Sequence, residues 1–245
     1  MCTVIYLPEQ AGYARFISIR DEHKARTLAR IPSIMYEGDV DVLSPIDPLG
    51  GGSWIGVNGF LDTIVLFNGA FTKHTAGGVY RMSRGVIVKH LLETGIPLVE
   101  WAYLLLDGIE PFSLLVFTDA QLYRLTWDGY QKHQEVLNKQ VPHIFSSVTL
   151  YDAQAAKRRA SLFRQWYDKV SRNPDTPIEV LCSSSNDMCN GFLIQRENGI
   201  RSQSISAIQY HKQSVSFKYH DLVNQSVHTA QIDLFSCLSC LNNGT

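Results

Sequence analysis

The pattern of apolar and polar residues predicts strands, then helices, then more strands, one long helix and a last set of strands. Residues 2–7 and 13–20 are rich in β-formers, and the short connection 8–12, with a proline and a glycine, predicts a hairpin. A second hairpin is expected around Asn198-Gly199. Residues 21–50 contain several prolines and predict irregular connecting structure. Strands are expected near 54–58, 62–68, 112–118, 121–127, 131–137, 191–196, 200–208, 213–219 and 227–234.

Helical spacing of apolar residues occurs in two regions. Residues 83–106 are divided by Gly95-Ile96-Pro97, which predicts two helices. Residues 152–170 predict one long helix with a single apolar stripe, and the basic run 157–159 is expected on its solvated side. The stripe consists of Ala156, Ala160, Phe163, Tyr167 and Val170.

The order of these elements predicts an α+β fold, with helical layers around antiparallel strands. Strands and helices do not alternate, which argues against a doubly wound parallel sheet. Neither an internal repeat nor a linker is apparent, so residues 1–245 are expected to form one domain, with a frayed end over about 236–245.

Charge is nearly balanced, with 22 Lys and Arg against 23 Asp and Glu. A near-neutral chain lacks the electrostatic footprint of a nucleic-acid or anionic-membrane binder. The most apolar region, 96–119, is interrupted by Glu100, Asp107 and Glu110, which argues against membrane insertion. The first fourteen residues contain neither Lys nor Arg, so no signal peptide is predicted. A cytoplasmic protein is expected, and homo-oligomer formation is left open.

The five cysteines are odd in number, which argues against a disulfide framework. Cys237 and Cys240 have the spacing of half a zinc site, but Cys182 and Cys189 are too far apart to complete it in the usual way. We therefore expect reduced thiols and neither a metal nor a cofactor. The glycines 50–52 lack the lysine of a phosphate-binding loop and are expected to allow a tight turn against packed backbone.

Cys2 is the residue that suggests chemistry. If Met1 is removed, this one residue carries a thiol, with a pKa of about 8.5, and an α-amino group, with a pKa of about 7.7–8.0. It would then supply both a nucleophile and a proton acceptor, which is the logic of N-terminal nucleophiles. The alternative is that Cys2 is a small buried hydrophobic residue.

The predicted hairpin strengthens the first interpretation, because it places the end of the second strand beside Cys2. Arg20 could favour the thiolate and bind a substrate carbonyl or carboxylate, and Asp21 could orient the α-amino group. These side chains are predicted to share one cleft with Cys2. The alternative is a solvated strand end with surface ion pairs of little energetic value.

These motifs resemble the NRDE family, also called the transport-and-Golgi-organization family, over most of the chain. The matching segments are Met1-Cys2-Thr3, Arg20-Asp21-Glu22, 51–56 (GGSWIG), 66–69 (LFNG), 80–85, 142–144 (PHI) and 146–147 (SS). The resemblance implies an N-terminal-nucleophile hydrolase fold with four αββα layers. It also implies kinship with cysteine amidases that cleave non-peptide C–N bonds, such as bile-salt hydrolases and penicillin V acylases.

The resemblance also implies roles for individual residues. Cys2, Arg20 and Asp21 match the catalytic core of those amidases, Asn68 matches an oxyanion-hole residue, and Ser147 stands where many relatives have a second Asn. Asn68 and Ser147 are predicted to lie on the rim of the shared cleft. The first Asn of the family motif is replaced by Ile19, a change expected to be neutral if Ile19 points into the core.

Two functions follow from this resemblance. One is a cysteine amidohydrolase acting on a small-molecule amide. The other is a non-catalytic protein that binds or transports haem or an acyl ligand in the old fold. The chain has no C-x-x-C-H haem attachment motif, and His74 and His143 are the conceivable axial ligands.

Overall fold

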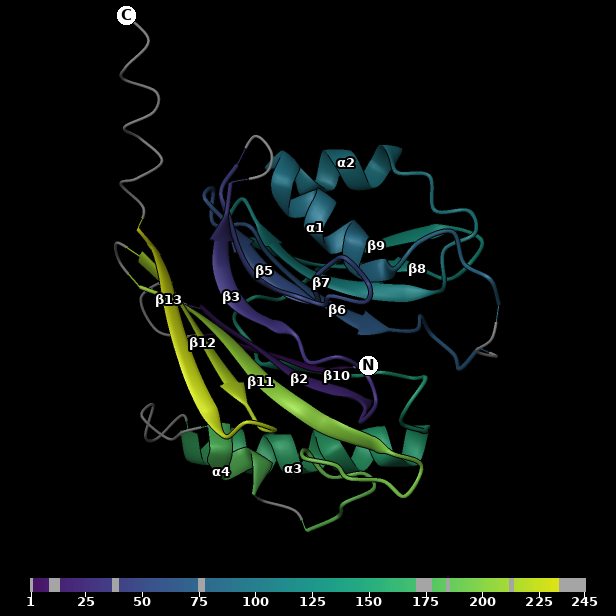
Figure 1. Cartoon of the computed structure of the whole chain (residues 1–245), viewed down its shortest axis with the longest axis vertical. Helices are drawn as coiled ribbons and strands as arrows, with labels where there is room; N and C mark the ends of the chain where they lie inside the picture. The colour runs from purple at the N-terminus through teal and green to yellow at the C-terminus, as the bar shows by residue number, and fades with distance from the viewer. Residues whose placement is uncertain are drawn as a thin grey trace, which may run out of the picture.

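The computed structural model describes residues 2–8, 14–36, 40–74, 78–170, 178–183, 186–211 and 214–233. They form four layers in the order αββα, with helices on the outer faces of two antiparallel sheets (Figure 1). The predicted fold class and layer order are therefore confirmed.

The first sheet has six strands in the order β10-β1-β2-β11-β12-β13, and helices α3 and α4 cover its outer face (Figure 1). Its strands are β1 (Cys2–Pro8), β2 (Ala14–His23), β10 (His143–Ser146), β11 (Ile200–Tyr210), β12 (Ser214–Asp221) and β13 (Ser226–Asp233). The helices are α3 (Ala153–Val170) and α4 (Ile178–Cys182).

The second sheet has seven strands in chain order, β3 to β9, and helices α1 and α2 cover its outer face (Figure 1). Its strands are β3 (Arg30–Met35), β4 (Val42–Ile46), β5 (Ile55–Asn58), β6 (Thr63–Asn68), β7 (Phe112–Thr118), β8 (Gln121–Trp127) and β9 (Lys132–Leu137). The helices are α1 (Arg84–Thr94) and α2 (Pro97–Tyr103). None of the helices in the described part of the chain combines the length and apolar character needed to cross a bilayer.

Strand β2 contributes to two hydrophobic cores because its side chains alternate between the faces of the sheet. Phe16 faces the second sheet, where its ring lies 5.7 Å from that of Phe117. Ile17 and Ile19 belong to the other core, with Phe163 of α3. Even-numbered positions of β2 thus face the space between the sheets, and odd-numbered positions face α3.

Three parts of the secondary-structure prediction are wrong. Residues 21–50 are not irregular, because they contain β3 and β4 at the edge of the second sheet. The expected strand over 191–196 is reduced to one isolated bridge, between Gln195 and Arg201. The prediction also missed β10 and α4, because elements this short do not show a periodic pattern in the sequence.

The apolar stripe of α3 was also misplaced. The buried positions are Ala155, Arg159, Phe163 and Trp166. Arg159 is completely buried, so the prediction that the whole basic run 157–159 is solvated is wrong. The sequence did indicate this burial: Arg159 lies four residues after Ala155 and four before Phe163, and residues at this spacing share a helix face.

Candidate active site

The N-terminal hairpin forms as predicted. Strand β1 begins at Cys2, lies between β10 and β2, and pairs antiparallel with β2 so that Cys2 stands opposite Arg20. The backbone of Cys2 is described, whereas its side chain and Met1 lie outside the described part. The position predicted for the nucleophile is therefore the first residue of an interior strand, beside the arginine expected there.

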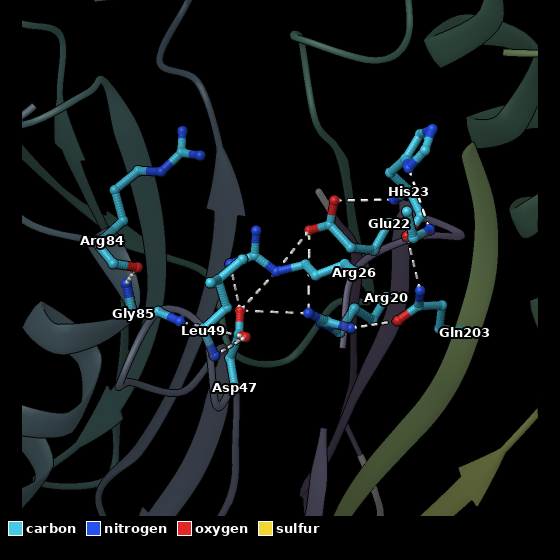
Figure 2. A network of polar contacts seen from close by, with 12 residues as sticks. Arg20, Glu22, His23, Arg26, Asp47, Leu49, Arg84, Gly85 and Gln203 are labelled. Atoms are coloured by element: carbon cyan, nitrogen blue, oxygen red, sulfur yellow. Dashed lines mark hydrogen bonds and ion pairs between the residues drawn. The ribbon is translucent and has the colours of Figure 1, made fainter. Parts of the chain in front are cut away.

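Arg20 is held from three directions, and Figure 2 shows the two polar contacts among them. Its Nη1 donates a 2.6 Å hydrogen bond to Oε1 of Gln203, and its Nη2 lies 3.4 Å from Oδ2 of Asp47. The guanidinium carbon lies 4.6 Å from the centre of the Trp54 ring, a cation–π distance. Because the side chain is almost fully buried, these contacts offset much of the cost of removing its charge from water.

A second guanidinium, that of Arg26, shares the same carboxylate (Figure 2). Its Nε and Nη2 donate to Oδ2 of Asp47 at 3.0 and 2.7 Å, and its Nε lies 3.7 Å from Oε2 of Glu22. Burial acts to raise the pKa of Asp47, but the hydrogen bond and charge of Arg26 outweigh it and hold that pKa below its usual value. Asp47 is therefore an anion between two cations.

These residues line a cavity of about 110 Å³ between the two sheets and the start of α1. Arg20 and Glu22 come from β2, Asn68 from β6, Ser83 is the N-cap of α1, and Arg84 is its first residue. Polar and charged groups dominate its walls. The lining is therefore suited to a small polar group and offers little apolar surface.

Glycines bring one wall of this cavity against α1. A Cβ atom on Gly52 would lie only 2.1 Å from the carbonyl carbon of Gly85, which is closer than real contacts allow. The backbone N–H of Ser53 donates to the Gly85 carbonyl at 3.0 Å. The expectation of a glycine segment packed tightly against backbone is confirmed, and its packing partner is the first turn of α1.

Asn68 and Ser147 lie next to each other, but only Asn68 lines the cavity. The hydroxyl of Ser147 is buried and donates to the backbone carbonyl of Asn68 at 2.8 Å. Gly69, which follows, has a φ of +87°, and a Cβ there would meet Val148 at 2.4 Å. The prediction that Ser147 lies on the rim of the cleft is wrong. It contacts the backbone that positions Asn68.

Asp21 lies on the opposite face of β2 from Arg20, so the prediction that both side chains face one cleft is wrong. Successive residues of a strand point to opposite faces, and Asp21 points toward α3. Its Oδ1 accepts a 2.6 Å hydrogen bond from Ser202 and its Oδ2 a 2.9 Å bond from Tyr151. Burial raises the pKa of this carboxyl, while the Ser202 hydrogen bond and the charge of Arg159 oppose the rise.

Arg159 extends the polar group on this face of the sheet. Its guanidinium lies 4.0 Å from the centre of the Tyr151 ring and donates to the hydroxyls of Thr3 and Ser146 and to the Gly191 carbonyl. Thr3 directly follows Cys2, so Arg159 ties the start of β1 to α3. We name Asp21, Tyr151, Arg159 and Ser202 the buried network.

Ile19, the residue that replaces the motif Asn, is fully buried in the core beneath α3 with Phe163 and Trp166. It points away from the cavity. The condition for a neutral replacement is therefore met, because an isoleucine in an apolar core needs no polar partner.

The two candidate haem ligands are engaged with other groups. Nε2 of His74 lies 2.9 Å from Oε1 of Glu110, and Nε2 of His143 lies 2.8 Å from the Asn138 carbonyl. Neither lines the cavity, so this arrangement does not fit a haem site there. Within the described ranges, no three His, Cys, Asp or Glu side chains are grouped to hold a metal. Cys237 and Cys240 lie outside those ranges.

Neighbours of Arg20 were missed by sequence reasoning. Trp54 and Glu22 belong to segments that match the family, but the sequence did not predict that they contact Arg20. Asp47 and Gln203 carried no signal, because they reach Arg20 only through pairing of distant segments. Gln203 lies at the irregularity in β11, between the positions paired with Asp21 and Arg20.

The four αββα layers, with a cysteine opening an interior strand, are those of the N-terminal-nucleophile hydrolases. The sequence profile of the family described as Transport and Golgi organisation 2 matches residues 1–230. The chain belongs to this family, as its motifs predicted.

Similar solved structures are amide hydrolases of this fold. An N-acylethanolamine-hydrolyzing acid amidase ortholog from Caenorhabditis elegans has a TM-score of 0.55 and 14% identity, covering 84% of this chain and 92% of that one. The C2A mutant of conjugated bile acid hydrolase from Clostridium perfringens has a TM-score of 0.56 and 12% identity, covering 96% and 93%. At these identities the likeness shows the fold. No curated protein sequence matches the chain.

Proposed function

We propose that this protein is an N-terminal cysteine amidohydrolase that cleaves the C–N bond of a small-molecule amide, with Cys2 as the nucleophile after removal of Met1. The observation that carries the proposal is the pairing of Cys2 with Arg20 at the edge of the polar cavity. Directly opposed residues of an antiparallel pair belong to the same face of the sheet. The nucleophile position and the cavity are therefore on the same side of β1 and β2.

The reaction proceeds in two stages. The α-amino group of Cys2 accepts the thiol proton, the sulfur attacks the amide carbonyl carbon, and the tetrahedral intermediate collapses as the ammonium group returns the proton to the leaving amine. The resulting thioester is attacked by water, whose proton the same α-amino group accepts. The products are a carboxylic acid, the free amine and the regenerated thiol.

Other residues have supporting roles in this mechanism. Arg20 is the cation opposite the nucleophile position, and its charge favours the thiolate form of Cys2. Asn68 lines the cavity and donates to the oxyanion. Asp21 is a positioning residue beneath the strand, and Ser147 positions Asn68 through its carbonyl.

Mass spectrometry and an activity screen test the proposal together. We expect the intact mass to lack Met1, and at least one amide among N-acyl amino acids, lactams and bile-salt conjugates to be hydrolysed. Cys2→Ala should abolish that hydrolysis, whereas Cys189→Ala, at an exposed thiol, should leave it unchanged. Full retention of Met1, or hydrolysis that survives Cys2→Ala, would overturn the assignment.

The second candidate is a non-catalytic protein that binds haem or an acyl ligand. The observation that favours it is that Asp21 and Ser147, two of the five predicted catalytic residues, do not line the cavity. A titration with haem distinguishes the two candidates. A shifted Soret band in the wild type that is lost in His74→Ala or His143→Ala would support a ligating haem site.

A further inference from the structure

A larger cavity, of about 700 Å³, lies at the opposite end of the second sheet from Asn68. Its walls are the loop 60–62 before β6, the junction 95–99 between the end of α1 and the start of α2, the end of β7 with the turn to β8 (117–120), and Tyr210 of β11. Strand β6 runs from this cavity at Thr63 to the first cavity at Asn68, a length of roughly 17 Å. The two cavities share no lining residue.

Apolar side chains at this cavity are open to solvent. Phe60, Ile96 and Val99 are 57%, 50% and 51% exposed, although large hydrophobic residues are usually buried. They come from two separate segments and line one cavity. Such a concave apolar surface, with a volume in the range of small-molecule pockets, is typical of a ligand site.

A carboxylate lies among these apolar residues. Asp62 lines the cavity and is only 4% exposed, and its Oδ2 accepts a 2.9 Å hydrogen bond from Asn58. Burial raises the pKa of this carboxyl, and the charge of Asp119 acts in the same direction. Among the described residues, no ion pair joins a cation to Asp62, and the lining contains no Lys, Arg or His. The Asp62 carboxyl is thus held by the neutral donors Asn58 and Thr118, and a cation that enters the cavity would favour its ionised form.

The walls of the cavity are held in place without a ligand. The hydroxyl of Tyr210 donates to the Leu61 carbonyl and lies 2.7 Å from the hydroxyl of Thr63. Oδ1 of Asn58 accepts from the backbone N–H groups of Phe60 and Asp62 at 3.1 and 2.8 Å. A ligand would therefore enter a preformed site, which lowers the entropic cost of binding.

We propose that this cavity binds an organic ammonium ion with an apolar body. The ammonium group lies against Asp62, within the field of Asp119, and the apolar body covers Phe60, Ile96 and Val99. This site is independent of the proposed amidase centre.

Calorimetric titration of the full chain with three ligands of the same skeleton tests the proposal. We expect 4-phenylbutylamine to bind at least tenfold more tightly than 4-phenylbutan-1-ol, and 4-phenylbutyrate to bind more weakly than the alcohol. The reason is that the three differ in charge and share the apolar body. Equal affinities for amine and alcohol, tighter binding of the carboxylate, or no binding of the amine at millimolar concentration would overturn it.

Variants assign the binding to this cavity. Asp62→Asn should weaken amine binding at least tenfold and leave alcohol binding unchanged. Because Asp62 is hydrogen-bonded within the fold, Val99→Lys provides a second variant that places a cation at the exposed rim and should also weaken amine binding. Asp107→Asn, at an exposed acid outside the cavity, and Cys2→Ala should have no effect. Undiminished amine binding in both Asp62→Asn and Val99→Lys would overturn the proposal.

Discussion

Arg20 and Asp21 are neighbours in the chain, yet they belong to two different electrostatic regions on opposite faces of β2. Arg20 faces the cavity, where Asp47, Glu22 and Arg26 are partly exposed and share contacts. Asp21 faces α3, where it and Arg159 are completely buried. The cavity region is a set of charges that water and a ligand can reach, whereas the buried network is closed.

The family motif 19–22 therefore contributes to both regions, because its successive side chains lie on opposite faces of β2. In the cavity, Asp47 contacts both arginines, so neither guanidinium depends on it alone and neither is the sole partner of its charge. In the buried network, an isolated charge would cost several kcal/mol, so its hydrogen bonds must all be kept. The buried network therefore ties β1 and β2 to α3, and the cavity side holds the charges that the proposed mechanism uses.

The largest expected effect comes from breaking the buried network. Arg159→Met should lower the free energy of unfolding by about 3–5 kcal/mol, because it leaves the hydroxyl of Thr3 and the charge of Asp21 without their cation. The matched control is Arg158→Met. That neighbouring side chain is 66% exposed, and its loss should cost less than about 0.5 kcal/mol. Urea denaturation measures both, and equal losses would contradict the contrast.

A smaller effect, opposite in sign for the two groups, is expected when the carboxylates of Asp47 and Asp21 are titrated. An unfolded Asp titrates near 3.9. The pKa of Asp47 is lowered in the folded protein. Its ionised carboxylate therefore stabilises the fold above about pH 3.9, and this stabilisation is lost as the pH falls through the folded pKa. The folded pKa of Asp21 is raised, so its ionisation reduces stability as pH rises from 3.9 through the folded pKa.

Urea unfolding at a series of pH values checks these opposite signs. The free energy of unfolding of the wild type, minus that of Asp47→Asn, should increase with pH. The same difference for Asp21→Asn should decrease with pH. Parallel slopes for the two variants would contradict the assignment of Asp21 and Asp47 to different electrostatic regions.

The long elements and the N-terminal hairpin were predictable from the sequence, because each is encoded locally. The apolar runs of β7 and β8 and the span of α3, though not its buried face, follow from their periodicities. The short segment 8–12 required that β1 and β2 be neighbours. The contact of Arg20 with Gln203 was not predictable, since it joins residues 183 positions apart. Arg159 was missed because a basic residue on an apolar stripe is rare, and its partners come from distant segments.

The separation of Arg20 from Asp21 could have been predicted. A strand over 13–20 that continues to Asp21 must place successive side chains on opposite faces. Arg20 and Asp21 were expected in one cleft because they are adjacent in the sequence. Adjacent residues of a strand, however, point to opposite faces of the sheet.

The smallest expected effect tests whether the cavity charges act as an adaptable group. The side chain of Arg26 is 27% exposed, so Arg26→Met should lower the free energy of unfolding by less than about 1 kcal/mol. Its loss leaves Asp47 with Arg20, 3.4 Å away, which limits the cost. Arg26→Lys, which keeps the charge, should lose less than Arg26→Met.

Salt sharpens this test. Raising the ionic strength to about 0.5 M should reduce the cost of Arg26→Met, because exposed charges are screened, but should leave the cost of Arg159→Met unchanged. Urea denaturation at low and high salt measures both. If Arg26→Met proved as costly as Arg159→Met and insensitive to salt, the cavity charges would be a rigid structural network. The division of tasks between the two faces of β2 would then fail.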